Sequence, residues 1–163
     1  MSNSSNIKWK RTEFFESKLR VPVLDQLIDV WVQPENDSSD LPSPAQLSAL
    51  EAFLALGPAQ KAEWTHQVAL DCHYTCLRLE TDGDTPPVRL RKRNDVWRHL
   101  RLATVFIPKH GKTADRYVFI DGSCDWEEEH GLQLLFKNER LLRVGQNEGL
   151  AMNEEWLLFF INE

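Results

Sequence analysis

A chain of 163 residues with 42% hydrophobic side chains is long enough to bury an apolar core without disulfide bonds or structural metals. Its net charge of −6 argues against a general nucleic-acid-binding protein, which needs a basic face. Three cysteines without a secretory signal predict reduced thiols and a cytoplasmic location, and no apolar run approaches the roughly 20 residues that a membrane span requires.

The N-terminal part of the chain predicts strands. Residues 1–6 are polar and are expected to form a frayed tail. Residues 14–33 have strand character, but Pro22 lacks the amide hydrogen that a central strand position needs. This stretch is therefore expected to be an edge strand or two short strands, and the turn-rich residues 34–44 predict a loop after it.

Two helices are predicted next. Ser43 is a typical capping residue, Pro44 suits the first helical position, and apolar side chains then recur every three or four residues. The pair Gly57-Pro58 is expected to end this helix and to begin a second one, which continues to about residue 79.

From residue 103 the pattern is that of short apolar strands separated by turn residues. The expected strands are 102–108, 116–122, 131–137 and 139–145, with a further strand within 154–162. The order of elements predicts an α+β fold, with an antiparallel β-meander in the C-terminal half and two helices packed on one face. Residues 1–163 are expected to form a single domain.

The segment DGSCDWEEEHG, residues 121–131, holds five acidic residues and a histidine. Three interpretations remain open: a solvated connection between strands, a surface that binds a protein partner, and a cation site. Hard cations need several oxygen ligands, but the spacing matches no EF-hand loop. Trp126 is expected either to pack onto the sheet or to lie exposed as an interface anchor. The metal-site interpretation uses Asp121, Asp125, Glu127 and His130.

Cysteine and histidine side chains form a second group of candidates. A helical segment could hold zinc through His66, Cys72, His73 and Cys76. No C-x2-C pair is present, so ordinary core packing of the cysteines is favoured. Cys124 lies six residues before His130, but it lacks a nucleophile elbow and a glycine-rich oxyanion loop, so it is expected to be a plain thiol.

The basic block RLRKRNDVWRHLR, residues 89–101, could contact phosphates. In a chain of net charge −6 it is expected instead to pair with the protein's own acids or to form a solvated face. Its members are Arg89, Arg91, Lys92, Arg93, Arg98 and Arg101, interleaved with Trp97 and His99.

Residues 124–149, CDWEEEHGLQLLFKNERLLRVGQNEG, resemble a signature of small uncharacterised bacterial domains, in which an acidic D-W-E-E-E-H-G turn precedes a hairpin and a polar tail. Glu139 stands where those domains commonly have glycine, so an Asn-Gly type I′ turn is not available in its usual form. The resemblance covers the C-terminal third of the chain. It implies an α+β domain without an assigned enzymatic activity, and some such domains resemble immunity proteins of polymorphic toxin systems.

We therefore expect a non-catalytic cytoplasmic domain that binds a protein partner, such as a basic toxin domain, through an acidic aromatic surface. No cofactor is expected, and Trp126 or Trp97 would serve as an anchor. The alternatives are a metal-dependent enzyme built on residues 121–130 and a nucleic-acid-binding module built on residues 89–101. The predicted partner surface consists of Asp125, Trp126, Glu127, Glu128, Glu129 and His130.

Overall fold

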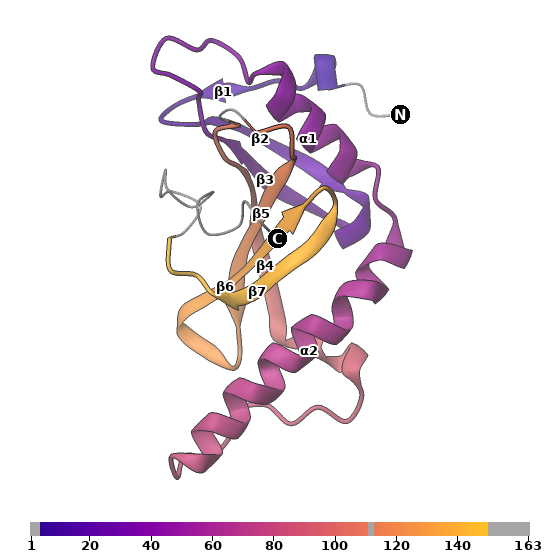
Figure 1. Cartoon of the computed structure of the whole chain (residues 1–163), viewed down its shortest axis with the longest axis vertical. Helices are drawn as coiled ribbons and strands as arrows, with labels where there is room; N and C mark the ends of the chain where they lie inside the picture. The colour runs from indigo at the N-terminus through magenta and orange to yellow at the C-terminus, as the bar shows by residue number, and fades with distance from the viewer. Residues whose placement is uncertain (1–3, 111–112, 150–163) are drawn as a thin grey trace.

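The computed structural model describes residues 4–110 and 113–149, in which one sheet is flanked by two helices (Figure 1). The strand predicted within 154–162 lies outside these residues. The strands are β1 (Lys10–Arg11), β2 (Phe15–Val21), β3 (Gln26–Val32), β4 (Leu100–Ile107), β5 (Tyr117–Cys124), β6 (Glu127–Lys137) and β7 (Arg140–Gln146). The helices are α1 (Pro44–Leu54) and α2 (Pro58–Thr81), with short 3-10 helices η1 (Ser4–Asn6), η2 (Pro22–Leu24) and η3 (Arg93–His99).

The seven described strands lie side by side in chain order. Neighbouring strands are antiparallel except β3 and β4, which run parallel. A parallel pair needs a long crossover connection, and α1 and α2 lie in the segment that joins these two strands. The structure therefore confirms an α+β fold with an antiparallel meander, β4 to β7, in the C-terminal half. It adds a smaller antiparallel unit, β1 to β3, before the helices.

The N-terminal segment differs from the prediction at residues 4–6 and confirms the second of the two alternatives for residues 14–33. Residues 4–6, expected in a frayed tail, form η1, and the Ser4 amide donates to Glu51 Oε1 at 3.2 Å. Pro22 begins η2, which turns the chain between β2 and β3, with Asp25 in the left-handed region at φ 51°. The stretch 14–33 is thus two strands, and β3 lies inside the sheet because β4 pairs with its other edge.

The start of α1 confirms the predicted cap. Ser43 Oγ accepts a hydrogen bond from the Gln46 amide at 3.3 Å, and Gln46 Oε1 accepts one from the Ser43 amide at 3.0 Å, which is a capping box. The Gln46 side chain is 1% exposed, and its Nε2 also donates to the carbonyls of Gln33 and Pro108 at 2.6 and 2.9 Å. One buried amide therefore fixes the start of α1 against the ends of β3 and β4.

The two faces of the sheet are buried by different groups. The larger core cluster joins residues of both helices to one face of the strands. At its centre, the ring centroids of Trp64 and Phe136 are 4.6 Å apart, and those of Phe53 and Phe136 are 5.3 Å apart. Both helices therefore pack on one face, as the sequence predicts. On the opposite face no helix of residues 4–110 or 113–149 packs, and we call it the helix-free face. It carries a smaller buried cluster of Phe106, Tyr117, Phe119 and Leu135, with Phe14 and Leu142 packed against it.

The hairpin between β5 and β6 is tighter than the sequence predicts. Cys124 pairs with Glu127, so β6 begins at Glu127 and not at residue 131. The acidic run is therefore mostly strand, and only two residues form the turn. The pairing is irregular beyond Gly122, and Gly131 lies there at φ 70° with space for no side chain, since a Cβ would approach the Gly122 oxygen to 2.4 Å.

The second hairpin, between β6 and β7, has left-handed backbone geometry at both turn residues although Glu139 stands in place of glycine. Asn138 and Glu139 both lie in the left-handed region, at φ 48° and 65°, as a type I′ turn requires. Arg116 holds this turn, because its Nε and Nη2 donate to the two Glu139 carboxylate oxygens at 2.6 and 2.8 Å. The bidentate ion pair, which also raises the pKa of Arg116, stabilises a residue in an unfavourable backbone conformation.

Candidate functional site

The predicted partner surface, residues 125–130, forms the tip of the β5–β6 hairpin, and we call it the hairpin tip. Trp126 is 3% exposed, and its Nε1 donates to Asp71 Oδ2 on α2 at 2.9 Å. Burial raises the pKa of Asp71, while the hydrogen bond from Trp126 opposes that rise. Trp126 is therefore an internal anchor that fastens the hairpin to α2 and not an exposed contact residue.

The side chains of Arg101 and His99 hold Asp125 in place. Arg101 Nη2 donates to its Oδ1 at 2.8 Å, and His99 Nδ1 lies 2.8 Å from its Oδ2. The Asp125 amide also donates to the His99 carbonyl at 3.0 Å. The hydrogen bonds from Arg101 and His99 hold the pKa of Asp125 below its ordinary value, so this carboxylate is charged at neutral pH and already partnered within the chain.

Glu127 is also engaged internally. Its Oε1 accepts from the His130 amide at 3.2 Å and lies 3.2 Å from His130 Nδ1, and its Oε2 accepts from Gln146 Nε2 at 2.7 Å. Its side chain is 15% exposed. Burial alone would raise the pKa of Glu127, but the hydrogen bonds from His130 and Gln146 outweigh it, and the pKa lies below its ordinary value.

Glu128 and Glu129 are the free charges of the hairpin tip. Both are exposed, and neither makes a hydrogen bond or an ion pair with any residue in the described ranges. Strand β7 pairs with β6 only from Leu132 onward, so these two residues lie beyond the end of β7. His130, 46% exposed, lies next to them. The hairpin tip thus divides into three fixed residues, 125–127, and three residues that face solvent, 128–130.

Asp121 bonds to a residue outside the hairpin tip. It faces Gln133 across the β5–β6 ladder and accepts from Gln133 Nε2 at 2.9 Å, and burial raises its pKa. Of the four residues of the predicted metal site, Glu127 and His130 contact each other, whereas Asp121 bonds to Gln133 and Asp125 bonds to Arg101 and His99. Across residues 4–110 and 113–149, no three His, Cys, Asp or Glu side chains are arranged to hold a metal ion.

The other candidate ligands and nucleophiles are dispersed in a similar way. Cys72 and Cys76 lie in the core beneath α2, whereas His66 and His73 are exposed. Burial, together with the neighbouring Cys76, raises the pKa of Cys72 to about 12. Burial raises the pKa of Cys124 to about 11, and its Sγ lies 3.8 Å from the Glu127 carbonyl. The Cys124 thiol is therefore protonated at neutral pH, as expected for a plain thiol.

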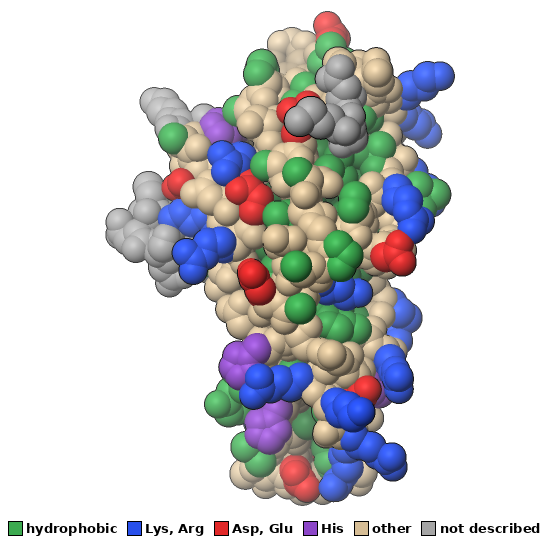
Figure 2. Space-filling view, turned by 90° about the vertical axis from the view of Figure 1, so that its right-hand side faces the viewer, with side chains coloured by type: hydrophobic (Ala, Val, Ile, Leu, Met, Phe, Trp, Pro, Cys, Tyr) green, Lys and Arg blue, Asp and Glu red, His purple; other side chains and the backbone are tan. Residues whose placement is uncertain are grey.

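The basic block is partly neutralised by the protein's own acids. Arg101 pairs with Asp125, and the ion pairs Arg98–Asp95 and Arg89–Glu80 measure 3.8 and 3.7 Å. Trp97 is partly buried: its Nε1 donates to Thr65 at 2.8 Å, and Lys61 lies over its ring. Figure 2 shows Lys, Arg and His side chains gathered over the lower part of the molecule, where α2 ends and the basic block follows it.

The sequence predicted the hairpin tip and the pairing of the basic block with the protein's own acids, as Arg101 pairs with Asp125, but it did not show which residues hold the tip. These residues come from α2, η3, β4 and β7, and none of them is close to the acidic run in the sequence. No local sequence signal marks them, because each contact forms only when the sheet and α2 are in place. They are Asp71, His99, Arg101 and Gln146.

The fold and the site define a small α+β domain with a charged hairpin fastened to a long helix. The chain belongs to the family described as Domain of unknown function (DUF6985), whose model matches residues 3–152. No curated protein and no solved structure matches the chain. Among the described helices, none combines the length and the apolar character that crossing a bilayer requires.

Proposed function

We propose that this chain is a non-catalytic protein-binding domain and that the exposed part of the hairpin tip contacts the partner. The partner is a protein with a basic surface. The activity that suits an acidic domain with such a partner is the neutralisation of a basic toxin domain. The observation that carries the proposal is the pair of carboxylates on Glu128 and Glu129. Both are exposed and uncommitted among the described residues, on a hairpin whose neighbouring residues are fixed by hydrogen bonds.

The fixed neighbours matter because a preorganised surface loses little conformational entropy when it binds. Trp126 is held by Asp71 on α2, and Asp125 is held by Arg101 on β4, so the turn that precedes the two glutamates is anchored at both of its residues. Adjacent negative charges on such a support attract a positive surface, accelerate association and disfavour acidic competitors.

A cytoplasmic location belongs to the same proposal. The three cysteines are free thiols in the structure, and all three are buried. Reduced cysteines are the usual state in the cytoplasm, where disulfide bonds are rare. The support is therefore that Cys72, Cys76 and Cys124 are free thiols.

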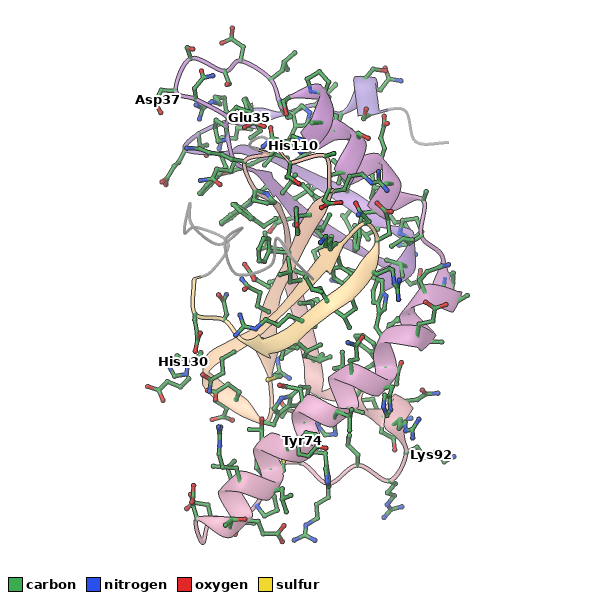
Figure 3. The ribbon with its side chains drawn as sticks, in the orientation of Figure 1. Glu35, Asp37, Tyr74, Lys92, His110 and His130 are labelled. Carbon is green, nitrogen blue, oxygen red and sulfur yellow. The ribbon has the colours of Figure 1, made fainter. Side chains whose placement is uncertain are left out.

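The test is affinity capture from extracts of the cells that produce the chain, with three forms of the protein as bait. The first is the natural sequence, and the second carries Glu128→Lys with Glu129→Lys. The third carries Asp37→Lys with Asp40→Lys, which makes the same change in charge at two exposed loop residues. Figure 3 shows that Asp37, in the loop that precedes α1, lies far from His130.

The proposal predicts a basic protein that the natural chain and the Asp37/Asp40 control both retain and that the Glu128/Glu129 variant loses. Retention should fall as salt is added, because the attraction between exposed charges is screened. If the Glu128/Glu129 variant and the control retain the same proteins in the same amounts, the hairpin tip is not the binding surface.

A further inference from the structure

The helix-free face of the sheet contains a cavity of about 330 Å³ that lies outside the hairpin tip. It is larger than the two cavities beside α2, which measure about 260 and 270 Å³. Its volume falls at the lower end of the range of small-molecule sites. The described residues that line it are Glu13, Phe14, Trp31, Phe106, Asp121, Gln133, Asn147 and Gly149.

One side of this cavity is an aromatic wall, formed by Phe14, Trp31 and Phe106. The rings of Phe14 and Trp31 are stacked, with centroids 5.6 Å apart and planes 10° apart. Phe106 meets Phe14 edge to face at 5.8 Å. Trp31 is 37% exposed, so its ring is in contact with the core on one side and open on the other. Such π faces attract cations as well as apolar groups.

The polar side chains that line the cavity are two carboxylates, Asp121 and Glu13, and two amides, Gln133 and Asn147. Gln133, 4% exposed, donates its Nε2 to Asp121 Oδ1 at 2.9 Å and to Asn147 Oδ1 at 3.4 Å. This arrangement fixes the Asp121 carboxylate, and no residue in the described ranges donates to its other oxygen, Oδ2. Glu13 adds a second carboxylate at the exposed margin. Among the described residues of the lining there is no Lys, Arg or His.

An aromatic wall, a fixed carboxylate with a free oxygen and a lining without basic groups together select for one kind of ligand. A metal ion would need several oxygen ligands around one point, whereas an organic cation needs one carboxylate for its charge and π faces for its carbon atoms. Burial raises the pKa of Asp121, and a bound cation would offset that cost by stabilising the charged carboxylate.

We propose that this cavity binds a small organic ammonium ion, with the charged nitrogen at Asp121 and the alkyl carbons against the aromatic wall. This site and its ligand are independent of the partner that the hairpin tip contacts, since none of residues 125–130 lines the cavity. The ammonium group donates to Asp121 Oδ2, and the buried Gln133 amide keeps the carboxylate oriented toward it.

The experiment is a titration of the isotopically labelled protein with n-butylammonium chloride, followed by the chemical shift of the Trp31 indole in NMR spectra. Butan-1-ol is the neutral probe of similar shape, and sodium butyrate is the anionic one. Saturable binding of butylammonium, at least tenfold tighter than that of the alcohol, is the expected result. Equal binding of the alcohol, or no saturable binding of butylammonium, would overturn the proposal.

Two variants locate the charge. Asp121→Asn keeps the size of the side chain and the acceptor for Gln133, and it should weaken butylammonium binding at least tenfold. Asp29→Asn removes a carboxylate on β3, two strands from β5, that pairs with Lys18 at 3.5 Å and does not line the cavity, and it should change binding less than twofold. An equal loss in both variants would show a general effect of charge and would contradict a defined site.

Two further measurements complete the test. Trp31→Leu removes part of the aromatic wall at a partly exposed position and should weaken binding several-fold, which keeps the proposal testable if Asp121→Asn does not fold. Nα-acetyl-lysine amide is the probe for a lysine side chain of a protein. If this probe binds more than tenfold tighter than butylammonium, the ligand is a lysine side chain of a partner protein and not a free amine. That result would overturn the proposal as stated.

Discussion

Replacement of Trp126 by phenylalanine tests the anchor on which the hairpin tip depends. The change keeps an aromatic ring in a site that is 3% exposed but removes the Nε1 donor to Asp71. A hydrogen bond to a charged group is worth about 1.5–3 kcal/mol, and the lower end applies because Asp71 is only partly buried. The smaller ring leaves a gap that costs a further ~1 kcal/mol. The free energy of unfolding should therefore fall by about 2.5 kcal/mol at pH 7.

The pH dependence of this loss identifies Asp71 as the partner. The folded state raises the pKa of Asp71, so this carboxyl group favours folding most below its unfolded pKa and becomes unfavourable as the pH rises through the folded value. Without the Trp126 donor, the pKa of Asp71 rises further. The loss of stability in Trp126→Phe should therefore be smaller near pH 4 than at pH 7, by about 1 kcal/mol.

The assay is urea denaturation of the natural chain, Trp126→Phe, Asp71→Asn and the double variant at both pH values. Asp71→Asn removes the partly buried charge and keeps an acceptor for Trp126, so it should leave stability at pH 7 unchanged or raise it. In the Asp71→Asn background, Trp126→Phe should lower the free energy of unfolding no more at pH 7 than at pH 4. A loss in Trp126→Phe that is the same at both pH values and in both Asp71 backgrounds would refute the reasoning.

The remaining predictions concern the two hairpins and the thiols. Glu139→Gly should be more stable than Glu139→Ala by about 1 kcal/mol in thermal or urea unfolding. Both variants lose the ion pair with Arg116, but only alanine keeps the cost of a positive φ. Equal stability would mean that residue 139 does not hold that conformation. Gly131→Ala should lower the free energy of unfolding by more than ~2 kcal/mol through its positive φ and a Cβ that meets the Gly122 oxygen, whereas Gly145→Ala meets only the flexible end of Arg143 and is the matched control. Cys124, with a pKa of about 11, and Cys72, at about 12, should react with a disulfide reagent at pH 8 only after unfolding, and rapid labelling of the native protein would contradict their burial.

Much of the fold follows from local sequence signals. The Ser43–Gln46 capping box and the Gly57-Pro58 boundary are short-range features, and both helices begin where these features predict. The β-meander follows in the same way, since its apolar segments and turn residues alternate along the chain. The parallel pairing of β3 with β4 depends on how the helices pack, and no local pattern encodes it.

The start of β6 shows why the site was harder to predict. Residues 127–129 are acidic and residue 130 is a histidine, a composition typical of a loop, yet they form a strand in which Glu127 pairs with Cys124. The anchor Trp126 lies between Cys124 and Glu127, and its hydrogen-bond partner Asp71 is distant in sequence. The acidic residues could therefore be named from the sequence, but their division into fixed and exposed groups depends on tertiary contacts. The cavity on the helix-free face was missed for the same reason, since β3, β4, β5 and β6 each supply part of its lining.

The most direct test of the protein-binding proposal is the affinity of the captured basic partner for the natural chain and for its two lysine variants, measured by calorimetry at low and at physiological salt. We predict that Glu128→Lys with Glu129→Lys weakens binding at least tenfold, a change of about 1.4 kcal/mol, and that it reduces the salt dependence. The Asp37/Asp40 control should bind as the natural chain does. Equal affinities for all three forms, at both salt concentrations, would contradict a binding surface at the hairpin tip.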